Sequence, residues 1–407
     1  MDANAALLRE AFEAALEAVR PRRWLAPALT GLPKRVRVIA VGKAAVAMAQ
    51  VFREVRGPPL EGLVVTPRGQ GEAVDGFRVL EAAHPVPDEG SALAGEAMLE
   101  LARRSGPDDL VLLLLSGGAS ALACAPIPGV SLRTKAEVTR RLLAAGVGIE
   151  DLNLVRRALS QLKGGGLVKA SGGARVVTLA QSDVPFDDLH VIGSGPGVPQ
   201  AVDADRALAL LAPEQRAAVE APVRAHAASL QTPVVGWEAH VLCPMRQSPA
   251  AAAARLAEAG WAVEEPEEWA ASAEDAARGH VERQRRKQVP AMVTFGETTV
   301  AVPTGAEGRG GRNQHFLLAL AVAYAGRRDV WALAADTDGV DGSSDAAGAW
   351  IDPALLGDSN VEEARAALAA CDAHGFFERH GRLLRTGATG VNVGDLRLLL
   401  VGPPPGA

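Results

Sequence analysis

Cysteine is scarce in this sequence of 407 residues, and its three cysteines stand far apart, at Cys124, Cys243 and Cys371. An odd count at such spacings matches neither a disulfide framework nor the paired ligands of a zinc site. Lysine is also rare, with six residues, so a lysine beside a glycine-rich turn is a candidate for a specific role. The cysteine pattern fits a reducing compartment, and we expect a cytoplasmic protein.

Long apolar runs and blocks of one charge are missing as well. No run approaches the roughly 20 apolar residues that cross a bilayer, and acidic side chains interrupt the N-terminal segment where a signal peptide needs an apolar core. The formal net charge is −6 without a basic cluster, so we expect neither a nucleic-acid nor a membrane partner. What is present, 48% apolar and 22% charged residues, is typical of a folded chain.

The length exceeds one ordinary hydrophobic core, so two domains are expected. An amphipathic helix is predicted over 5–19, and then strands with unbroken apolar runs, such as 36–42, alternate with helices. Such strands are covered on both faces, which predicts an α/β fold with a mostly parallel, doubly wound sheet. An alanine-rich stretch that ends in a proline turn near residue 230 marks the expected boundary. The expected domains are therefore 1–230 and 231–407, the second again α/β.

The apolar strand 110–115 ends in the sequence SGGAS. In a parallel, doubly wound sheet, ligands bind beyond the carboxyl ends of the strands. Gly117 and Gly118 allow a tight turn that brings backbone N–H groups close to a ligand, and Ser116 and Ser120 add hydroxyl donors. The segment predicts an anion cradle. A plain turn from strand to helix, with serine as the helix cap, is the alternative.

Two further segments place cations beside such turns. Lys43 follows the glycine that ends the first strand and opens a predicted helix. The positive end of a helix dipole disfavours a cation at that position unless an anionic ligand is present. A solvated lysine is the alternative. The stretch NLVRRALSQLKGGG sets Arg156, Ser160 and Lys163 at the spacing of one helix face, before a three-glycine turn. A solvated basic face is the alternative there.

Acidic side chains end two of the predicted strands. Asp183 ends the strand 175–183, and Asp336 and Asp338 end a later strand with both carboxylates on one face. Carboxylates beside anion cradles suggest a bridging Mg²⁺. Activation of a hydroxyl and turns closed by Asx hydrogen bonds are the alternatives.

A second glycine-rich segment, TGAEGRGGRNQH, contains Gly308, Gly310 and Gly311. A helix is expected to start near Asn313, with Arg312 beside it. Glycine backbone and arginine at a helix start suit phosphate oxygens; a flexible loop is the alternative. Together, the glycine loops, rare lysines, arginines and strand-end aspartates indicate phosphoryl transfer, which depends mainly on positioning and charge stabilisation. These residues do not name the acceptor.

These motifs, in this order, resemble the class II glycerate 2-kinase family, whose C-terminal module is called MOFRL. The resemblance runs along nearly the whole chain and rests on VGKAAVAMA (41–49), HPVPDE (84–89), LLSGGASAL (114–122), NLVRRALSQLKGGGL (153–167), SDV (182–184), IGSGP (192–196), GGRNQ (310–314), DTDGVDGSSDAAGA (336–349) and TGATGVNVGDL (386–396). Each motif alone is weak, but the ordered set is specific.

The resemblance implies an N-terminal Rossmann-like domain and a C-terminal MOFRL-type α/β domain with a cleft between them. It implies phosphorylation of D-glycerate at the 2-hydroxyl by ATP with Mg²⁺, which gives 2-phosphoglycerate. Lys43 and Arg312 match the positions where the family places its catalytic basic groups, and Asp183 matches the aspartate of the SDV motif.

The segments and the resemblance together assign expected roles. The expected substrate-binding residues are Ser116, Gly117, Gly118, Ser120, Arg156 and Lys163. The expected nucleotide-binding residues are Gly308, Gly310, Gly311 and Asn313. Asp183, Asp336 and Asp338 are the expected metal ligands, and Asp183 is also a candidate to orient the hydroxyl. The expected cofactors are ATP and Mg²⁺, the expected partner is a small molecule, and a homodimer is an open alternative that the sequence does not decide.

Several positions depart from the family pattern. Phe186 replaces the usual glycine, Gln200 the usual aspartate, Ala388 and Val391 the usual proline and threonine, and Cys371-Asp372-Ala373 a typical Asn-Asp-Ser. The alternative activity is an NAD(P)-dependent hydroxypyruvate reductase, but VGKAAVAMA has one glycine where a dinucleotide site needs G-x-G-x-x-G. A non-catalytic module that binds sugar acids or sugar phosphates is the third alternative.

Overall fold

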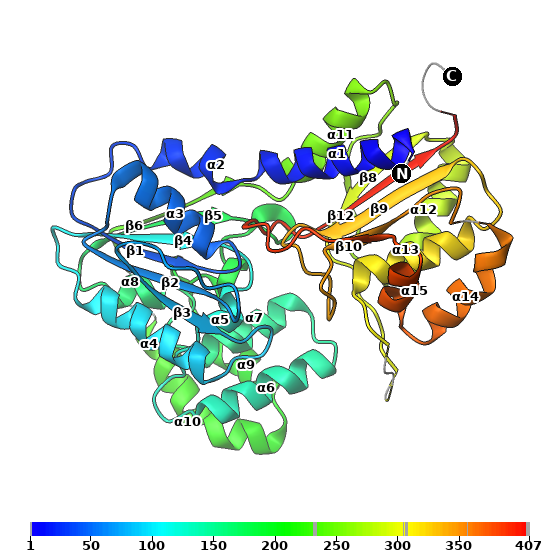
Figure 1. Ribbon diagram of the computed structural model, residues 1–407. Helices are drawn as coiled ribbons and strands as arrows, with labels where there is room; N and C mark the ends of the chain where they lie inside the picture. The colour runs from blue at the N-terminus through cyan, green and yellow to red at the C-terminus, as the bar shows by residue number, and fades with distance from the viewer. Residues whose placement is uncertain (1, 231–233, 304, 306–307, 356, 404–407) are drawn as a thin grey trace. The chain divides into compact units, whose positions relative to one another are not determined.

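The computed structural model describes residues 2–230, 234–303, 305, 308–355 and 357–403. The chain forms two compact units (Figure 1). One unit contains residues 21–244, and the other contains residues 1–20 together with 245–407.

The unit of residues 21–244 is built on a six-stranded sheet. Its strands are β1 (Val36–Val41), β2 (Glu61–Pro67), β3 (Phe77–Ala82), β4 (Leu110–Leu115), β5 (Arg175–Gln181) and β6 (Trp237–Cys243). They lie in the order β3-β2-β1-β4-β5-β6, and every neighbouring pair is parallel. The order changes direction between β1 and β4, and such switch points hold the ligands of doubly wound sheets. The predicted α/β fold with a parallel sheet is confirmed.

Helices cover this sheet and form a cluster beside it. They are α2 (Pro21–Ala28), α3 (Ala45–Arg56), α4 (Glu89–Arg103), α5 (Ala119–Leu122), α6 (Leu132–Ala144), α7 (Ile149–Ala158), α8 (Gly166–Ala170), α9 (Ala204–Ala209) and α10 (Pro213–Ser229), with 3₁₀ turns η1 (Pro185–Asp187) and η2 (Ile192–Ser194). Helix α3 packs against β1, β2 and β4, whereas α4, α5 and α8 share a core with the strands. Helices α6, α7, α9 and α10 bury a core of their own. In the described part of the chain, no helix has the length and apolar content needed to span a bilayer.

The second unit has a mixed sheet. Its strands are β7 (Glu267–Glu268), β8 (Ala291–Phe295), β9 (Val330–Asp336), β10 (Gly348–Ile351), β11 (Leu383–Leu384) and β12 (Asp395–Val401). Their order is β11-β10-β9-β12-β8-β7, with β7 and β8 parallel and the other pairs antiparallel. The helices are α1 (Ala3–Ala18), α11 (Gln247–Glu258), α12 (Ala273–Lys287), α13 (Arg312–Ala323), α14 (Asp358–Ala369) and α15 (Ala373–Arg379).

Both faces of the mixed sheet are covered. Along β9, Ala332 and Ala334 join a core with the helices α12 to α15, whereas Leu333 and Ala335 join a core with α1 and α11. This alternation follows from the period of two in a strand. Each face therefore buries one apolar set of side chains.

The helix predicted over 5–19 forms as α1, but its partners are unexpected. Leu8 and Phe12 are buried in the core with α11 and the mixed sheet, so the start of the chain packs with residues 245–407. Strand β6 also differs from expectation, because it pairs in parallel with β5 instead of opening the second unit. The compact units thus differ from the sequence-based limits 1–230 and 231–407.

Candidate active site

The turns after β1 and β4 are joined at the switch point of the parallel sheet. Ser116 Oγ accepts a hydrogen bond from Ala44 N at 3.1 Å, and Lys43 N donates to Gly117 O at 2.9 Å. Gly42 must lack a side chain, because a Cβ there would lie 2.2 Å from Ser116 Oγ. Ser116 is fully buried in this contact. Its hydroxyl ties the two turns together, and its expected contact with substrate stays a prediction.

Lys43 lies in the turn before α3, which begins at Ala45, and not in the first turn of the helix. Gly118 has a φ of 82°, in the left-handed region that favours glycine. A Cβ at Gly118 would lie 3.3 Å from Lys43 Cγ and 3.4 Å from His84 Cδ2. The predicted residues Lys43, Gly117 and Gly118 therefore lie together, and His84 is an addition that the sequence did not single out.

Lys163 and Ser120, both predicted to bind substrate, are in direct contact. Lys163 Nζ donates to Ser120 O at 2.6 Å and to Ser120 Oγ at 2.9 Å. Ser120 Oγ lies 2.9 Å from Ser194 Oγ, which donates to Asn153 Oδ1 at 2.9 Å. A chain of four polar side chains thus links the SGGAS turn, η2 and α7.

The predicted helix face of Arg156, Ser160 and Lys163 does not form, because α7 ends at Ala158. Ser160 instead forms a β-bridge with Pro126. This long-range backbone pairing replaces further helical hydrogen bonds. The local helical spacing of the sequence could not indicate such a pairing. Arg156 remains on the helix, whereas Lys163 lies in the turn that follows.

Cations are concentrated around this turn. Burial first, and then the neighbouring charges of Lys135 and Arg156, hold the pKa of Lys163 well below its usual range. Burial also lowers the pKa of Lys135, which is 2% exposed, and of Arg156. Lys135 Nζ donates to Leu159 O at 3.1 Å, so both lysines donate to neutral oxygens. An anionic ligand would offset the cost of keeping such groups charged.

Asp183 is half-buried and lies two residues beyond β5, which ends at Gln181, at the carboxyl end of the sheet. The loop after it contains two residues with positive φ, Phe186 at 60° and Asp187 at 53°. Phe186 is 95% exposed. The backbone therefore adopts the conformation that suits the family's usual glycine, although this chain carries phenylalanine there.

In the other unit, Arg312 is the first residue of α13 and is held by three carboxylates. Its Nε donates to Asp395 at 2.6 Å, and its Nη2 donates to Glu297 at 2.8 Å and to Asp336 at 3.0 Å. Burial opposes the charged form, but the three carboxylates outweigh it and raise the pKa of Arg312 above its ordinary value. The guanidinium is therefore charged and fixed in direction.

Asp341 caps the start of α13. Its carboxylate accepts hydrogen bonds from Asn313 N at 3.1 Å and Gln314 N at 2.9 Å. Gly311 permits this approach, because a Cβ there would lie 2.2 Å from Asp341 Oδ1. Burial and the nearby Asp395 raise the pKa of Asp341 to about 7. Asn313 is fully buried and also donates to Asp395, so its expected nucleotide contact stays a prediction.

A pocket of about 470 Å³ lies beside the start of α13. Its lining includes the predicted residues Gly308, Gly310 and Gly311 together with Arg312. Gly308 needs to be glycine, because a Cβ there would lie 2.6 Å from the backbone of Cys371. The pocket has the size of a ligand site. Residues 304, 306 and 307 of the glycine-rich segment lie outside the described residues.

The predicted pair of acidic residues lies at a turn, because β9 ends at Asp336. Asp338 N donates to Asp336 Oδ1 at 3.0 Å, and Val340 N donates to Asp338 Oδ1 at 2.8 Å. These are the Asx hydrogen bonds of the alternative interpretation. Among the described residues, no group of three His, Cys, Asp or Glu side chains is arranged to hold a metal ion. Mg²⁺ at a phosphoryl-transfer site needs only one or two carboxylates beside the phosphates, so the metal assignments stay predictions.

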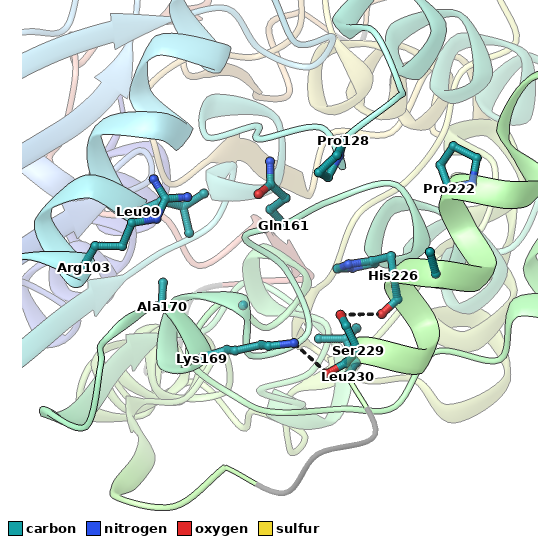
Figure 2. Close-up of a pocket in the computed structure, with 12 residues that line it drawn as sticks. Leu99, Arg103, Pro128, Gln161, Lys169, Ala170, Pro222, His226, Ser229 and Leu230 are labelled. Carbon is teal, nitrogen blue, oxygen red and sulfur yellow. Dashed lines mark hydrogen bonds between the residues drawn. The ribbon is translucent and has the colours of Figure 1, made fainter.

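A second pocket, of about 420 Å³, lies among α4, α8 and α10 (Figure 2). Its lining includes Leu99, Arg103, Lys169 and His226, and none of the residues predicted to form the site. Lys169 Nζ donates to Ser229 O at 2.6 Å, across the pocket wall.

Five residues of these sites have no role predicted from the sequence: His84, Asn153, Ser194, Asp341 and Asp395. All five lie inside the motifs quoted above, as polar residues among glycines or apolar residues. A polar side chain at an otherwise apolar helix position, such as Asn153, is a signal that could have identified them.

Comparison with family models matches both parts of the chain. A model described as a domain of unknown function (DUF4147) covers residues 7–228, and the MOFRL family model covers residues 290–395.

Curated relatives match over the full length. A Thermotoga maritima protein named "D-glycerate 2-kinase" is 36% identical over 96% of this chain and 97% of its own. The human "Glycerate kinase" is 34% identical over 97% and 92%. An Agrobacterium vitis protein named "Putative hydroxypyruvate reductase" is 39% identical over 97% and 94%.

The crystal structure of a glycerate kinase from Thermotoga maritima has a TM-score of 0.84 and 34% identity, covering 98% of this chain and 99% of its own. The order of the motifs, the parallel sheet with its switch point, the two matching family models and the full-length relatives agree. The chain belongs to the glycerate kinase family, with an N-terminal DUF4147 region followed by a MOFRL module.

Proposed function

We propose that this protein is a D-glycerate 2-kinase. In the proposed reaction, the bond between the γ-phosphorus of ATP and its bridging oxygen breaks, and a bond forms from that phosphorus to the 2-hydroxyl oxygen of D-glycerate. The products are ADP, 2-phosphoglycerate and the hydroxyl proton. The observation that carries the proposal is Lys163, a buried lysine that donates to neutral oxygens beside other cations. That setting favours an anionic ligand, and a glycerate carboxylate satisfies it.

The substrate arm of the proposal uses the SGGAS turn and its partners. Lys163 and Arg156 would bind the carboxylate, while Ser120 and the backbone at Gly117 and Gly118 would hold the hydroxyls. Lys43, whose side chain passes Gly118, would neutralise charge that develops on the transferred phosphoryl group.

The nucleotide arm uses the pocket at the start of α13. Gly308, Gly310 and Gly311 line this pocket and would offer backbone N–H groups to phosphate oxygens, while Arg312 supplies a fixed positive charge. The pocket lining and the three carboxylates that orient Arg312 support this assignment.

Magnesium fits the chemistry of the residues around Arg312. Three carboxylates face one guanidinium there, so the local charge is negative and accommodates a divalent cation. Asp336 and Asp338, or Asp183 in the other unit, are the proposed ligands. When bound with the phosphates, Mg²⁺ would neutralise their charge.

A hydroxypyruvate reductase is the second candidate, because two relatives with 39% and 37% identity carry that name. Its dinucleotide would need a glycine-rich turn after β1 and an acidic residue about 20 residues further on, for the ribose. Here Ser116 and Gly42 close that turn against each other, and β2 ends in Thr66 and Pro67. The geometry therefore supports the kinase.

Purified protein with D-glycerate, ATP and Mg²⁺ tests the proposal. We expect release of ADP and a ³¹P spectrum of 2-phosphoglycerate instead of 3-phosphoglycerate. NADH oxidation with hydroxypyruvate, without ADP release, would reject the kinase in favour of the reductase. Binding of glycerate without turnover in either assay would support a non-catalytic module.

Lys43→Ala tests the catalytic assignment. We expect kcat to fall by roughly 100-fold or more, because a charge aimed at the transition state is removed. The unfolding temperature should stay unchanged. Lys34→Ala, at an exposed lysine, is the matched control and should keep normal kcat. Near-normal turnover of Lys43→Ala would reject its role.

A further inference from the structure

We infer that Asn153 is a further substrate-binding residue, whose side-chain amide donates to the carboxylate of the substrate. The inference deepens the proposed glycerate kinase function and rests on it. Asn153 lies on α7 and is 2% exposed. Its Nδ2 has no hydrogen-bond partner among the described residues. A buried amide donor without a partner costs roughly 1–3 kcal/mol, so its presence beside a binding turn points to a missing acceptor.

The direction of the hydrogen-bond chain fixes which end of the amide is open. The Lys163 ammonium can only donate, so Ser120 Oγ accepts from it. The Ser120 hydroxyl then gives its own proton to Ser194 Oγ, and Ser194 gives its proton to Asn153 Oδ1. Each serine hydroxyl thus accepts from the residue before it in the chain and donates to the residue after it. The amide oxygen of Asn153 is therefore occupied, and its NH₂ group is the free end.

The backbone at Ser194 supports the same assignment. Ser194 has a φ of 62° and is fully buried, a conformation that is costly for a residue other than glycine. It is held by hydrogen bonds from Ser194 N to Val191 O at 2.9 Å and from Gly164 N to Ser194 O at 3.1 Å. The fold therefore maintains this strained serine at the position where its hydroxyl meets Asn153.

The donors near Asn153 match an oxyanion. Arg156 stands three residues further along α7, on the same side of the helix, and makes no hydrogen bond or ion pair within the described part of the chain. The Nε of Arg157, four residues from Asn153, is buried and also lacks a partner. With Lys163, these groups offer donors and positive charge. A carboxylate accepts from donors of this kind and balances their charge, whereas a neutral alcohol would leave the cations without a counter-charge.

A nucleotide phosphate presents the same oxyanion chemistry, so the test must separate the two ligands. Asn153→Asp keeps the size and shape of the side chain, and its first oxygen still accepts from Ser194. Its second oxygen replaces the NH₂ donor with a negative charge that faces the substrate. We expect the KM for D-glycerate to rise roughly 10- to 100-fold, the effect of losing a hydrogen bond to a charged group. The KM for ATP should not change.

Thr178→Val is the matched control. Thr178 is fully buried in β5, and its Oγ1 also lacks a partner among the described residues, but it lies outside the proposed site. This variant should keep the wild-type KM for D-glycerate. The unfolding temperature of Asn153→Asp should not fall, because the new carboxylate gains neighbouring cations. A merely structural role of Asn153 would lower that temperature and leave KM unchanged.

Calorimetric titration of D-glycerate without ATP separates the two proposals. If wild-type protein phosphorylates glycerate and Asn153→Asp keeps its KM, the inference is wrong and the kinase stands. An increase in the KM for ATP instead would assign the donors to a phosphate and also overturn the inference. If wild type shows no turnover but binds glycerate, and Asn153→Asp loses binding, the site stands and the kinase is rejected. Absence of both turnover and binding would overturn both.

Discussion

Lys163 and Phe186 are two residues whose side chains are unfavourable in their surroundings. Lys163 is 1% exposed beside other cations, and Phe186 is 95% exposed with a φ of 60°. Residues that break a local rule are often held in place for function. Lys163 fits this description, because its ammonium reaches the SGGAS turn. Among the described residues, Phe186 makes no hydrogen bond, ring stacking or cation–π contact that would explain its position.

Phe186→Gly should stabilise the protein. Relief of the left-handed conformation contributes about 1 kcal/mol for a residue with a Cβ, and the exposed ring offers little burial in return. Chemical denaturation should show a higher midpoint with an unchanged slope. Phe186→Ala is the control, because it removes the ring but keeps the strain. An equal gain in both variants would assign the effect to the ring.

Several residues of the site were predictable from the sequence, and others were not. Ser120 and Lys163 stood out because a hydroxyl and a rare lysine flank glycine turns, and the structure places them in contact. Asn153 and Ser194 carry weaker local signals, a polar side chain at an otherwise apolar helix position and a serine between two glycines. Their role depends on a hydrogen-bond chain between residues that are far apart in sequence, which spacing alone does not reveal.

At the scale of the element, the start of α13 depends on a carboxylate from another loop. Asp341 accepts from the backbone N–H groups of the second and third helical residues, which a helix start leaves without intrahelical partners. No local capping residue does this, because the residue before the helix is Gly311. The position of Arg312 therefore depends on Asp341.

Asp341→Asn should change how stability depends on pH. The pKa of Asp341 is raised from 3.8 to about 7, so the folded state binds the proton more tightly than the unfolded chain. The stabilising contribution of this group is complete below the unfolded pKa and is lost as pH rises toward about 7. The free energy of unfolding should thus fall less steeply across that window in Asp341→Asn than in wild type.

Urea denaturation at a series of pH values measures this difference. Asp345→Asn is the control, because Asp345 is exposed and its ion pair with Arg385 lowers its pKa. That variant should leave the slope of the unfolding free energy against pH unchanged between pH 3.8 and about 7. Parallel curves for wild type and Asp341→Asn would contradict the assignment.

Element prediction succeeded where the pattern is local. The buried strands 36–41 and 110–115 were predictable from unbroken apolar runs between turns. The end of α7 was not, because the bridge from Ser160 to Pro126 depends on tertiary pairing. The start of α3 shifted past Lys43, because Lys43 N donates to Gly117 O of the neighbouring turn.

At the scale of the whole molecule, one of the two units is not continuous in sequence, because residues 1–20 join residues 245–407 and residues 21–244 form the other unit. Helix α1 covers one face of the mixed sheet, whose strands begin after residue 245. Its amphipathic stripe was evident from the spacing of apolar residues. The sheet that the stripe covers was not predictable, because both units offer apolar sheets to cover.

Phe12→Ala should weaken the unit of residues 1–20 and 245–407 selectively. Phe12 is 1% exposed, and truncation of a buried phenylalanine costs roughly 3–5 kcal/mol. Hydrogen exchange should become faster in β9 and β12 and stay unchanged in β1 and β4. Glu13→Ala, at an exposed position of the same helix, should alter neither. Uniformly faster exchange across both units would reject this division of the chain.

The packing of α1 also has a consequence for biosynthesis. A ribosome releases α1 before residues 21–244, yet the strands that α1 covers are translated last. All strands of the parallel sheet have been translated once β6 is made. The apolar stripe of α1, in contrast, stays exposed to solvent or bound to a chaperone until the mixed sheet is translated. Nascent chains that stall after residue 244 would therefore carry one folded unit and one amphipathic helix, α1, whose apolar face is not covered by its sheet.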